Sequence, residues 1–353
     1  MKSKFIENSS YFCPGEYFFD DSLRFIYLKD SKSYETSKEL FGEPIMSVGK
    51  KIFVYVVKKL FFDKGILINP NESVSEFKGT AYFIGTDKTD SGKAFDFVNN
   101  KVITFYFSEK EFDVNLNNNY YFKQYFNSPR IIMYDKFKLL IMEELISYKA
   151  YTHLSAEERD TVMISIFKHY IDYFKVCQSQ GRVILKRPSS MLAELETQEE
   201  LRNLLEETNQ KHILEEDFPF LQMHGDLWAP NILLNKKDNE ELYFIDFEYS
   251  GEYLFLYDIF WFIQDQVVNY NNNNFLEKYL IGAYDSYLKL MFGIFGLSFR
   301  EGCRRDYLRI YFINVYINRW RKLDKKDREI QVNRFRSIIS SSHRNDETLK
   351  QYS

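Results

Sequence analysis

Three polar side chains occur at informative spacings in the second half of the sequence. Asp226 lies in the segment His-Gly-Asp-Leu-Trp-Ala-Pro-Asn, Asn231 ends that segment, and Asp246 follows twenty residues after Asp226. Phosphoryl transfer from a nucleoside triphosphate needs such a set. One carboxylate orients the attacking hydroxyl and accepts its proton, while a carboxamide and a second carboxylate hold magnesium. The spacing therefore predicts a catalytic base at Asp226 and a magnesium site at Asn231 and Asp246.

Each of these residues also has an ordinary explanation. Asp226 alone could cap backbone amides in a turn, Asn231 could form an Asx turn, and Asp246 could cap a strand end. The set is harder to explain in this way, because a hairpin between Ile232 and Phe247 would bring Asn231 and Asp246 to the same open end. Carboxylates held close together raise each other's pKa unless a cation is present, which favours a metal site over separate caps.

Three further residues have expected supporting roles. His224 has no recognisable Cys or Ser partner, so we interpret it as a brace of the loop through hydrogen bonds and not as a nucleophile. Glu248 is two residues beyond Asp246 and is expected near the metal. Asp258 precedes the apolar run Ile-Phe-Trp-Phe-Ile, where the ordinary interpretation is a helix N-cap.

Length and composition indicate a globular protein large enough for two lobes. The chain has 353 residues, of which 45% are hydrophobic and 28% charged, an ordinary balance for a soluble domain. Its net charge of -4 gives no basic surface that would indicate a nucleic acid or an anionic membrane as a partner. The oligomeric state is not readable from these quantities.

The cysteines and the apolar segments bear on location. Cys13, Cys177 and Cys303 are far apart and fit neither a disulfide framework nor a zinc site. No apolar run of eighteen residues predicts a transmembrane helix, and the first residues do not have the pattern of a signal peptide. We therefore expect a cytoplasmic protein without a membrane span.

Local patterns divide the chain into three parts. Residues 1–75 are expected to form an N-terminal extension or extra elements of the first lobe, residues 76–143 a β-rich lobe, and residues 144–353 a helical lobe with the catalytic loop. Within the β-rich part, Asn99-Asn100 predicts the turn of a hairpin. The strands are expected at residues 80–84, 94–98, 102–107, 130–134 and 138–142, and a helix at residues 109–126.

Capping boxes and periodicity predict helices in the last part. The expected boxes are Ser155 with Glu158, Thr197 with Glu200, and Ser298 with Glu301. The first helix is expected to end at Gly181. Its buried face is predicted from apolar residues at helical spacing: Val162, Ile166, Tyr170 and Phe174.

The motif segments resemble those of the aminoglycoside phosphotransferase and choline kinase group of small-molecule kinases. The resemblance is specific over residues 221–260 and extends in coarse layout to residues 77–335. It implies an α+β, bilobal protein-kinase-like fold with a β-rich N-lobe and a mainly helical C-lobe. By position, it implies that Asp226 is the catalytic base, that Asn231 and Asp246 hold Mg²⁺, and that His224 and Asp258 are supports.

The same resemblance extends to nucleotide binding and to the acceptor. Residues 139–143 resemble the hinge strand, so backbone groups of Met142 and Glu143 are implied to contact the base of ATP or GTP. Gly225 replaces the arginine of the protein-kinase loop, and only eleven residues separate Asp246 from Asp258. This leaves no room for an activation loop and favours a small hydroxyl acceptor: a sugar, an amino alcohol or an aminoglycoside-like compound.

The first lobe departs from the family pattern. A strand lysine should pair with the α- and β-phosphates, but Thr104 occupies the expected place, with Lys93 and Lys101 as other candidates. Gly79 and Gly85 give a weak signal of a phosphate-covering loop, and Glu109 or Glu111 is the candidate partner of the lysine. The alternatives are therefore a pseudokinase or nucleotide-binding module without transfer activity, and less strongly a nucleotidyltransferase.

The acceptor itself is not identified by the sequence. Tyr253, Trp261 and Trp320 could surround a quaternary amine through cation–π contacts, although core packing is the favoured interpretation. Acidic residues of the helical part could face a cationic substrate, but solvated helix faces are favoured for most of them. These residues are Asp265, Glu277, Asp285, Glu301 and Asp306.

Overall fold

The computed structural model describes residues 2–20, 25–30, 32–33, 35–36, 66–68, 76–84, 91–193, 211–236 and 241–341. The chain packs into two compact units. Unit 1 contains residues 1–162 and 232–248, and unit 2 contains residues 163–231 and 249–353. The three-part division expected from the sequence stays a prediction. Gly85 and the Thr197–Glu200 capping box lie outside the described residues.

Unit 1 contains an eight-stranded antiparallel sheet with the strand order β3-β1-β2-β4-β5-β6-β8-β7. Its strands are β1 (Gly15–Asp20), β2 (Phe25–Leu28), β3 (Ile66–Ile68), β4 (Ala81–Ile84), β5 (Ser91–Asp96), β6 (Lys101–Tyr106), β7 (Ile131–Asp135) and β8 (Leu140–Glu144). The strands expected between residues 80 and 142 are confirmed. The three strands before residue 76 belong to the same sheet.

The hairpin of β5 and β6 sets the positions of Lys93 and Thr104. Asp96 pairs with Lys101 across the Asn99-Asn100 turn, and Lys93 pairs with Thr104. Asn100 has a φ of 50°, a conformation that asparagine adopts more readily than most residues. The Asp96 carboxylate accepts the backbone N–H of Asn99 at 2.9 Å. The predicted hairpin is confirmed, with its turn stabilised by an aspartate.

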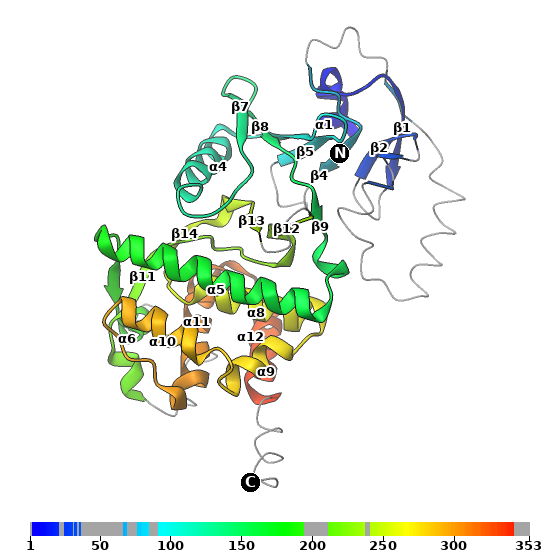
Figure 1. Cartoon of the computed structure of the whole chain (residues 1–353). Coiled ribbons are helices and arrows are strands. Elements are labelled where there is room, and N and C mark those ends of the chain that lie inside the picture. The colour runs from blue at the N-terminus through cyan, green and yellow to red at the C-terminus, as the bar shows by residue number, and fades with distance from the viewer. Residues whose placement is uncertain are drawn as a thin grey trace. The chain divides into compact units, whose positions relative to one another are not determined.

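Helix α4 (Glu109–Phe122) packs beside the β6–β8 end of this sheet (Figure 1). Ser108 is its N-cap and accepts the backbone N–H of Glu111 at 3.3 Å. Phe112 and Phe122 are buried, so the helix attaches through its aromatic face. Short α1 (Lys2–Glu7) and the 3₁₀ turn η1 (Ser9–Tyr11) precede the sheet. The helix expected at residues 109–126 is confirmed, but it ends at Phe122.

A second, smaller sheet of unit 1 has the order β13-β12-β9. Its strands are β9 (Tyr148–Lys149), β12 (Ile232–Asn235) and β13 (Leu242–Phe244), and the 3₁₀ turn η2 (Tyr151–His153) follows β9. Ile232 pairs with Phe244, which confirms the predicted hairpin. Residues 237–240 of its turn lie outside the described part of the chain. Phe247 stacks on Phe122 of α4 with ring centroids 4.8 Å apart, so the hairpin is packed into unit 1.

Helices α6 to α12 give unit 2 its mainly helical character (Figure 1). The helices are α6 (Pro188–Ala193), α8 (Tyr257–Tyr270), α9 (Asn274–Leu280), α10 (Asp285–Ile294), α11 (Arg304–Asn318) and α12 (Lys325–Ser341), and α5 (Ala156–Ser179) begins in unit 1 and continues into unit 2. A sheet of β10 (Ile184–Lys186), β11 (Phe218–Met223) and β14 (Gly251–Leu254) accompanies them. The remaining 3₁₀ turns are η3 (Lys211–Glu215), η4 (Ala229–Asn231), η5 (Phe247–Tyr249), η6 (Glu301–Cys303) and η7 (Trp320–Lys322). The α+β class, with a β-rich N-terminal part and a mainly helical C-terminal part, is confirmed.

The capping box at the start of α5 forms as predicted. The Glu158 backbone N–H donates to Ser155 Oγ at 3.2 Å, and the Ser155 N–H donates to Glu158 Oε2 at 2.7 Å. Gly181 follows the helix with a φ of 64°, as expected of a glycine after a helix C-terminus. The predicted apolar face is buried: Val162, Ile166, Tyr170 and Phe174.

The capping box predicted at Ser298 and Glu301 is wrong. Helix α11 begins at Arg304, and its N-cap residue, Cys303, makes no side-chain cap hydrogen bond. Glu301 instead begins η6, and its carboxylate pairs with Lys289 Nζ at 2.7 Å. The ion pair and the 3₁₀ turn therefore use the glutamate that a capping box would need.

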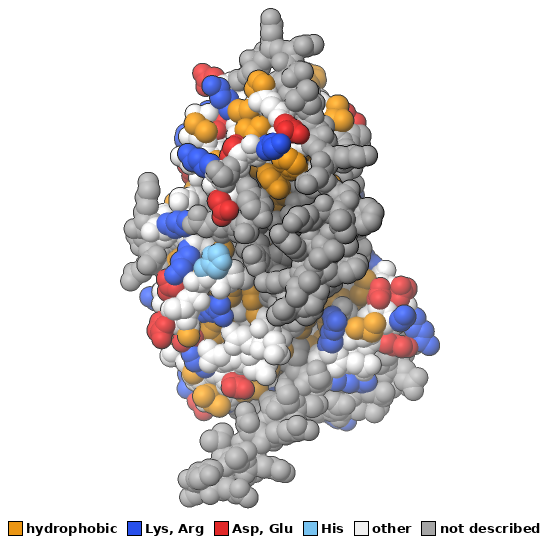
Figure 2. Space-filling model, turned by 90° about the vertical axis from the view of Figure 1, so that its right-hand side faces the viewer, with side chains coloured by type: hydrophobic (Ala, Val, Ile, Leu, Met, Phe, Trp, Pro, Cys, Tyr) orange, Lys and Arg blue, Asp and Glu red, His pale blue; other side chains and the backbone are white. Residues whose placement is uncertain are grey.

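Charged side chains of both signs are interspersed over the face shown in Figure 2. This agrees with the small net charge of the sequence. Among the described helices, none is both long and apolar enough to cross a membrane.

Candidate active site

Asp258 fixes the backbone of the loop that carries Asp226. Its carboxylate accepts the N–H groups of His224 and Gly225, both at 2.8 Å, and the hydroxyl of Tyr170 at 2.7 Å. Asp258 is completely buried in the first turn of α8, where Leu256 holds the N-cap position. The interpretation of Asp258 as an N-cap is therefore wrong. Burial raises its pKa to about 6, although the three donors oppose that rise.

Gly225 is required by the shape of this loop. Its φ is 79°, a conformation that residues with a side chain rarely adopt. A Cβ at this position would also collide with the backbone carbonyl oxygen of Tyr249. Packing within unit 2 therefore explains why glycine, and not a residue with a side chain, occupies position 225.

Asp226 is held from two sides. Asn231 Nδ2 donates to the backbone oxygen of Asp226 at 2.9 Å and reaches its carboxylate at 3.4 Å. Arg319 Nη2 lies 3.0 Å from the other carboxylate oxygen of Asp226. His224 Nδ1 accepts the N–H of Asp226 at 3.3 Å. Unit 2 thus brings together Asp226, Asn231, His224 and Asp258, all of which were candidates from the sequence.

Arg319, which follows α11, was not among the residues singled out from the sequence. Its guanidinium also donates to the backbone oxygen of Gly225. It lies over the rings of Trp261, at 4.2 Å from the centroid, and Tyr249, at 4.7 Å. The side chain is 20% exposed. A cation fixed between two aromatic rings therefore orients the Asp226 carboxylate.

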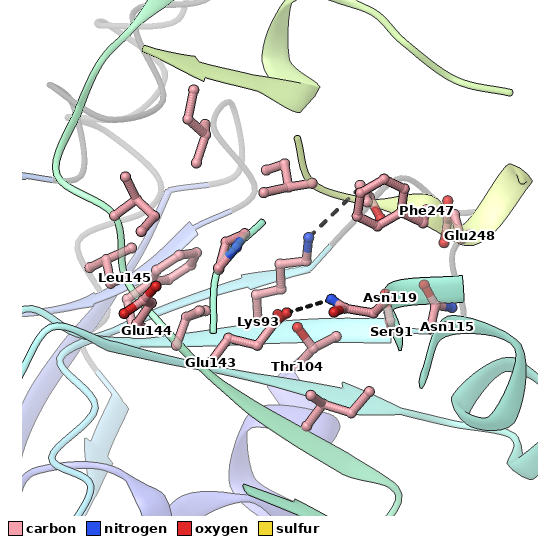
Figure 3. Close-up of a pocket in the computed structure, with 18 of the residues that line it drawn as sticks. Ser91, Lys93, Thr104, Asn115, Asn119, Glu143, Glu144, Leu145, Phe247 and Glu248 are labelled. Atoms are coloured by element: carbon pink, nitrogen blue, oxygen red, sulfur yellow. Dashed lines mark hydrogen bonds and ion pairs between the residues drawn. The ribbon is translucent and has the colours of Figure 1, made fainter. Parts of the chain in front are cut away.

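Lys93 lies in a pocket of unit 1 (Figure 3). Asp246 also lines this pocket. The two side chains form an ion pair, with Lys93 Nζ at 3.8 Å from Asp246 Oδ2. Thr104, its cross-strand neighbour, also lines the pocket. Lys101 instead pairs with Glu76 at 4.0 Å. Of the two lysines considered, the structure therefore places Lys93 beside the predicted metal-binding segment.

Three carboxylates affect the pKa of Lys93. Asp246 raises the pKa of Lys93 most strongly, burial opposes this, and Glu143 and Glu248 raise it further. Glu143 accepts a hydrogen bond from Asn119 Nδ2 at 2.9 Å (Figure 3). Burial raises the pKa of Glu143 to about 7, against the effect of Lys93. The negative charge near Lys93 therefore comes from three carboxylates, of which Asp246 has the largest effect.

Asp246 has an uncommon backbone conformation, with a φ of 69°. Non-glycine residues with positive φ are infrequent and cluster at functional sites. It lies in unit 1 with Glu248, whereas Asn231 lies in unit 2 immediately before β12. Among the described residues, no three His, Cys, Asp or Glu side chains form a complete metal-binding cluster. A cation here would therefore need an amide ligand or phosphate oxygens in addition to Asp246.

The predicted hinge residues differ in their surroundings. Glu143 lines the pocket of unit 1, whereas the Met142 side chain packs in the core of the sheet with Phe12 and Ile103. Leu145 and Ile146, which follow β8, also line the pocket. The backbone contact of Met142 and Glu143 with a nucleotide base stays a prediction.

A second cavity, of about 320 Å³, lies within unit 2. Asp226 forms part of its wall. The three tryptophans of the chain, Trp228, Trp261 and Trp320, all line it. The catalytic candidate is therefore accessible from a cavity of the size expected for a small-molecule site.

The other candidate acceptor contacts mostly have partners within the protein. Tyr253 stacks on Tyr257 with centroids 4.3 Å apart. Trp320 packs against Phe312 with ring centroids 4.9 Å apart. Three of the acidic candidates form ion pairs: Asp285 with Arg304, Glu301 with Lys289, and Asp306 with Arg309. Asp265 is buried and hydrogen-bonded, and Glu277 is exposed.

A family model described as "Phosphotransferase enzyme family" matches residues 176–292. The matched part contains His224, Asp226, Asn231, Asp246 and Asp258. The resemblance to small-molecule phosphotransferases inferred from these residues is therefore confirmed over this part of the chain. None of the curated proteins matches the sequence.

Among the solved structures that match this chain are small-molecule kinases of low sequence identity. Choline kinase LicA from Streptococcus pneumoniae is 12% identical, with 84% of this chain and 100% of that chain covered and a TM-score of 0.45. Aminoglycoside phosphotransferase APH(3'')-Id from Streptomyces rimosus is 12% identical, with 64% and 89% covered and a TM-score of 0.38. An ethanolamine kinase from Plasmodium vivax is 16% identical, with 92% and 97% covered and a TM-score of 0.40.

Proposed function

We propose that this protein transfers the γ-phosphate of ATP, or of GTP, to a hydroxyl group of a small molecule. The observation that carries the proposal is the position of Asp226. Its carboxylate is oriented by Asn231 and Arg319 at the wall of a cavity, on a loop whose backbone is fixed by Asp258. A carboxylate held in this way can orient a hydroxyl and accept its proton.

The remaining roles follow from the chemistry of the side chains. Lys93 would pair with the nucleotide phosphates, and Asn231 and Asp246 would hold Mg²⁺, with Glu248 nearby. Bound magnesium neutralises phosphate charge during the transfer. Asn231 immediately precedes β12 and Asp246 follows β13 by two residues, so the β12–β13 hairpin connects the two proposed ligands along the chain. His224 and Asp258 would maintain the loop.

Two further parts of the proposal concern the nucleotide base and the location of the protein. Backbone groups of Met142 and Glu143 would contact the nucleotide base. A cytoplasmic location is consistent with the three free cysteines, Cys13, Cys177 and Cys303. The alternative of a pseudokinase rests on the lack of a lysine at the expected strand position, and the ion pair of Lys93 with Asp246 supports the kinase over it.

The test is the substitution Asp226→Asn. It keeps the size of the side chain but removes the proton acceptor, so we expect turnover with a screened hydroxyl acceptor to fall by about 10²–10⁴-fold. Binding of Mg-ATP, measured by thermal shift, should remain. The control is Asp172→Asn, because Asp172 is exposed and pairs with Lys175 of the same helix. Full activity of Asp226→Asn would refute the role of this residue.

A further inference from the structure

Asp265 is a buried carboxylate to which the proposed function gives no role. It lies in α8, is 5% exposed and lines the unit 2 cavity together with Asp226. Burial raises its pKa, although three hydrogen-bond donors oppose that rise. An aspartate is seldom buried unless its partners compensate for the loss of water, so these donors indicate what Asp265 does.

One of the three donors belongs to the catalytic loop, residues 224–231. Asp265 Oδ2 accepts the backbone N–H of Ala229 at 3.0 Å. The other two donors, Asn269 Nδ2 at 2.7 Å and Gln266 Nε2 at 3.3 Å, belong to the same helix or its immediate C-terminal turn. Asp265 therefore connects α8 to the catalytic loop, and the connection is the Ala229 N–H.

Asp265 and Asp258 hold this loop on either side of Asp226. The two aspartates are seven residues apart in α8, which is about two helical turns, so they lie on the same face of the helix. Asp258 accepts the backbone N–H groups of the two residues before Asp226. Asp265 accepts that of Ala229, which follows Asp226 by three residues. One helix face therefore holds both halves of the loop.

Hydrogen bonds within the loop link Ala229 to the side chains proposed to act in the reaction. The backbone oxygen of Asp226 accepts the N–H of Trp228 and the side-chain amide of Asn231, both at 2.9 Å. The Asn231 N–H donates to the Trp228 oxygen at 3.0 Å. Ala229 lies between Trp228 and Asn231 in the chain, inside this set of bonds. A displacement of Ala229 would therefore shift Asp226 and Asn231 relative to each other.

We propose that Asp265 is a positioning residue of the transfer reaction. Through the Ala229 N–H it holds the second half of the catalytic loop and so sets the relative positions of Asp226 and Asn231. The proposal rests on the proposed function for the roles of those two side chains. The reaction requires from Asp265 a hydrogen-bond acceptor at one oxygen, and not its negative charge. Small displacements of reacting groups are costly, since a shift of about 1 Å can reduce a rate a hundredfold.

The experiment compares Asp265→Ala with Asp265→Asn in the full-length protein. Both remove the charge from the cavity wall, but the amide oxygen of asparagine can still accept the Ala229 N–H. With an acceptor identified by a hydroxyl screen, we expect kcat of Asp265→Ala to fall by about tenfold to a hundredfold. The KM for that acceptor should stay within about threefold of wild type, because the contact acts on the loop and not on the bound acceptor. Asp265→Asn should restore kcat to within about threefold of wild type.

Hydrogen exchange tests the same contact without any measurement of activity. An amide that loses its acceptor exchanges faster, so exchange in residues 227–231 should speed up by at least about tenfold in Asp265→Ala and stay near wild type in Asp265→Asn. Asn314→Ala is the matched control. Asn314 is also a buried side chain of unit 2 that accepts a backbone N–H, that of Leu254 in β14. Its loss should speed up exchange in β14 and leave the loop unchanged.

The possible outcomes separate this role from a direct contact with the acceptor. A raised KM with unchanged kcat in both variants would show that the charge of Asp265 binds the acceptor, and would overturn the proposal. Equal losses of kcat in both variants, or unchanged exchange of the loop in Asp265→Ala, would also overturn it. Each of these results leaves the proposed function intact, whereas failure of the wild-type protein to phosphorylate any hydroxyl acceptor would refute the proposed function itself.

Discussion

At the scale of single residues, Lys93 shows why the sequence left the phosphate-binding lysine open between several positions. The sequence pointed to Thr104 as the position where a phosphate-binding lysine should lie. The structure pairs Thr104 with Lys93 across the β5–β6 hairpin, so both line the same pocket. Side chains of cross-strand pairs lie on the same face of a sheet. A single sequence does not show which residues of two neighbouring strands pair with each other.

Lys93 provides a prediction with an internal control. Lys93→Met removes the cation beside Asp246 and should weaken binding of Mg-ATP by about tenfold to a hundredfold, since a charge-assisted hydrogen bond contributes roughly 1.5–3 kcal/mol. Lys101→Met is the control, because that lysine lies in the adjacent strand but pairs with Glu76. Isothermal titration calorimetry measures both. Equal affinities of the two variants would show that Lys93 has no special role.

The parts of the candidate site that could be predicted are those close together in the sequence. His224, Asp226 and Asn231 share one loop, and their residue types and spacing reveal it. Arg319 could not be predicted, because it contacts Asp226 from a residue after α11. Contacts formed by packing between distant elements leave no local pattern in the chain.

At the scale of elements, Asp258 connects α5, α8 and the loop before η4. Tyr170 is on α5, Asp258 is on α8, and the loop supplies the N–H groups of His224 and Gly225. The carboxylate is buried, and three donors partly compensate for the loss of water. The geometry of the loop therefore depends on how two helices pack.

This arrangement makes stability depend on pH. The pKa of Asp258 is about 6 in the folded protein against an ordinary value of 3.8. The native state therefore binds the proton more tightly between about pH 4 and pH 6, and the contribution of Asp258 to the free energy of unfolding falls as the pH rises through that window. Above pH 6 the ionised carboxylate relies on its three donors.

Tyr170→Phe tests this dependence. It removes one donor to the ionised carboxylate, so we expect a loss of about 1.5–3 kcal/mol in the free energy of unfolding at pH 8 and a smaller loss at pH 5. Urea unfolding at the two pH values measures it. Tyr279→Phe is the matched control, because the buried Tyr279 hydroxyl donates to the neutral backbone oxygen of Arg304. A loss for Tyr170→Phe that is equal at both pH values would contradict the explanation.

The two capping boxes show why a local motif predicts one helix and not another. Ser155 and Glu158 satisfy each other's backbone N–H groups at the start of α5. Ser298 and Glu301 have the same spacing, but Glu301 pairs with Lys289 of α10. A partner brought close by tertiary packing competes with the local cap, and the sequence alone does not reveal that competitor.

At the scale of the whole molecule, the sequence predicted the order of a β-rich part followed by a helical part. It left open whether residues 1–75 form an extension or extra elements of the first lobe, and the structure places β1, β2 and β3 in the main sheet. The segments of β1 and β2, Gly-Glu-Tyr-Phe-Phe-Asp and Phe-Ile-Tyr-Leu, are rich in aromatic residues that fit either a strand or a buried helix. Their pairing with β4 decides between these structures, and pairing is a non-local property.

The separation of the two cavities between the units gives a prediction for the molecule as a whole. The pocket with Lys93 is lined only by residues of unit 1, and the cavity with Asp226 only by residues of unit 2. The non-hydrolysable nucleotide AMP-PNP with Mg²⁺ should therefore slow hydrogen exchange most strongly in β5, β6 and residues 141–148, because bound ligand stabilises the elements that contact it.

The same measurement tests the proposed role of magnesium. Chelation with EDTA should reduce this protection, because three carboxylates around Lys93 otherwise repel the phosphates. Asp246→Asn should show little further loss on chelation, whereas Asp135→Asn should behave as wild type. Asp135 is a suitable control because it also lies in unit 1 but accepts the backbone N–H of Phe137 in an exposed turn. Protection confined to unit 2, or unaffected by EDTA in the wild-type protein, would contradict nucleotide binding through Lys93 and a cation at Asp246.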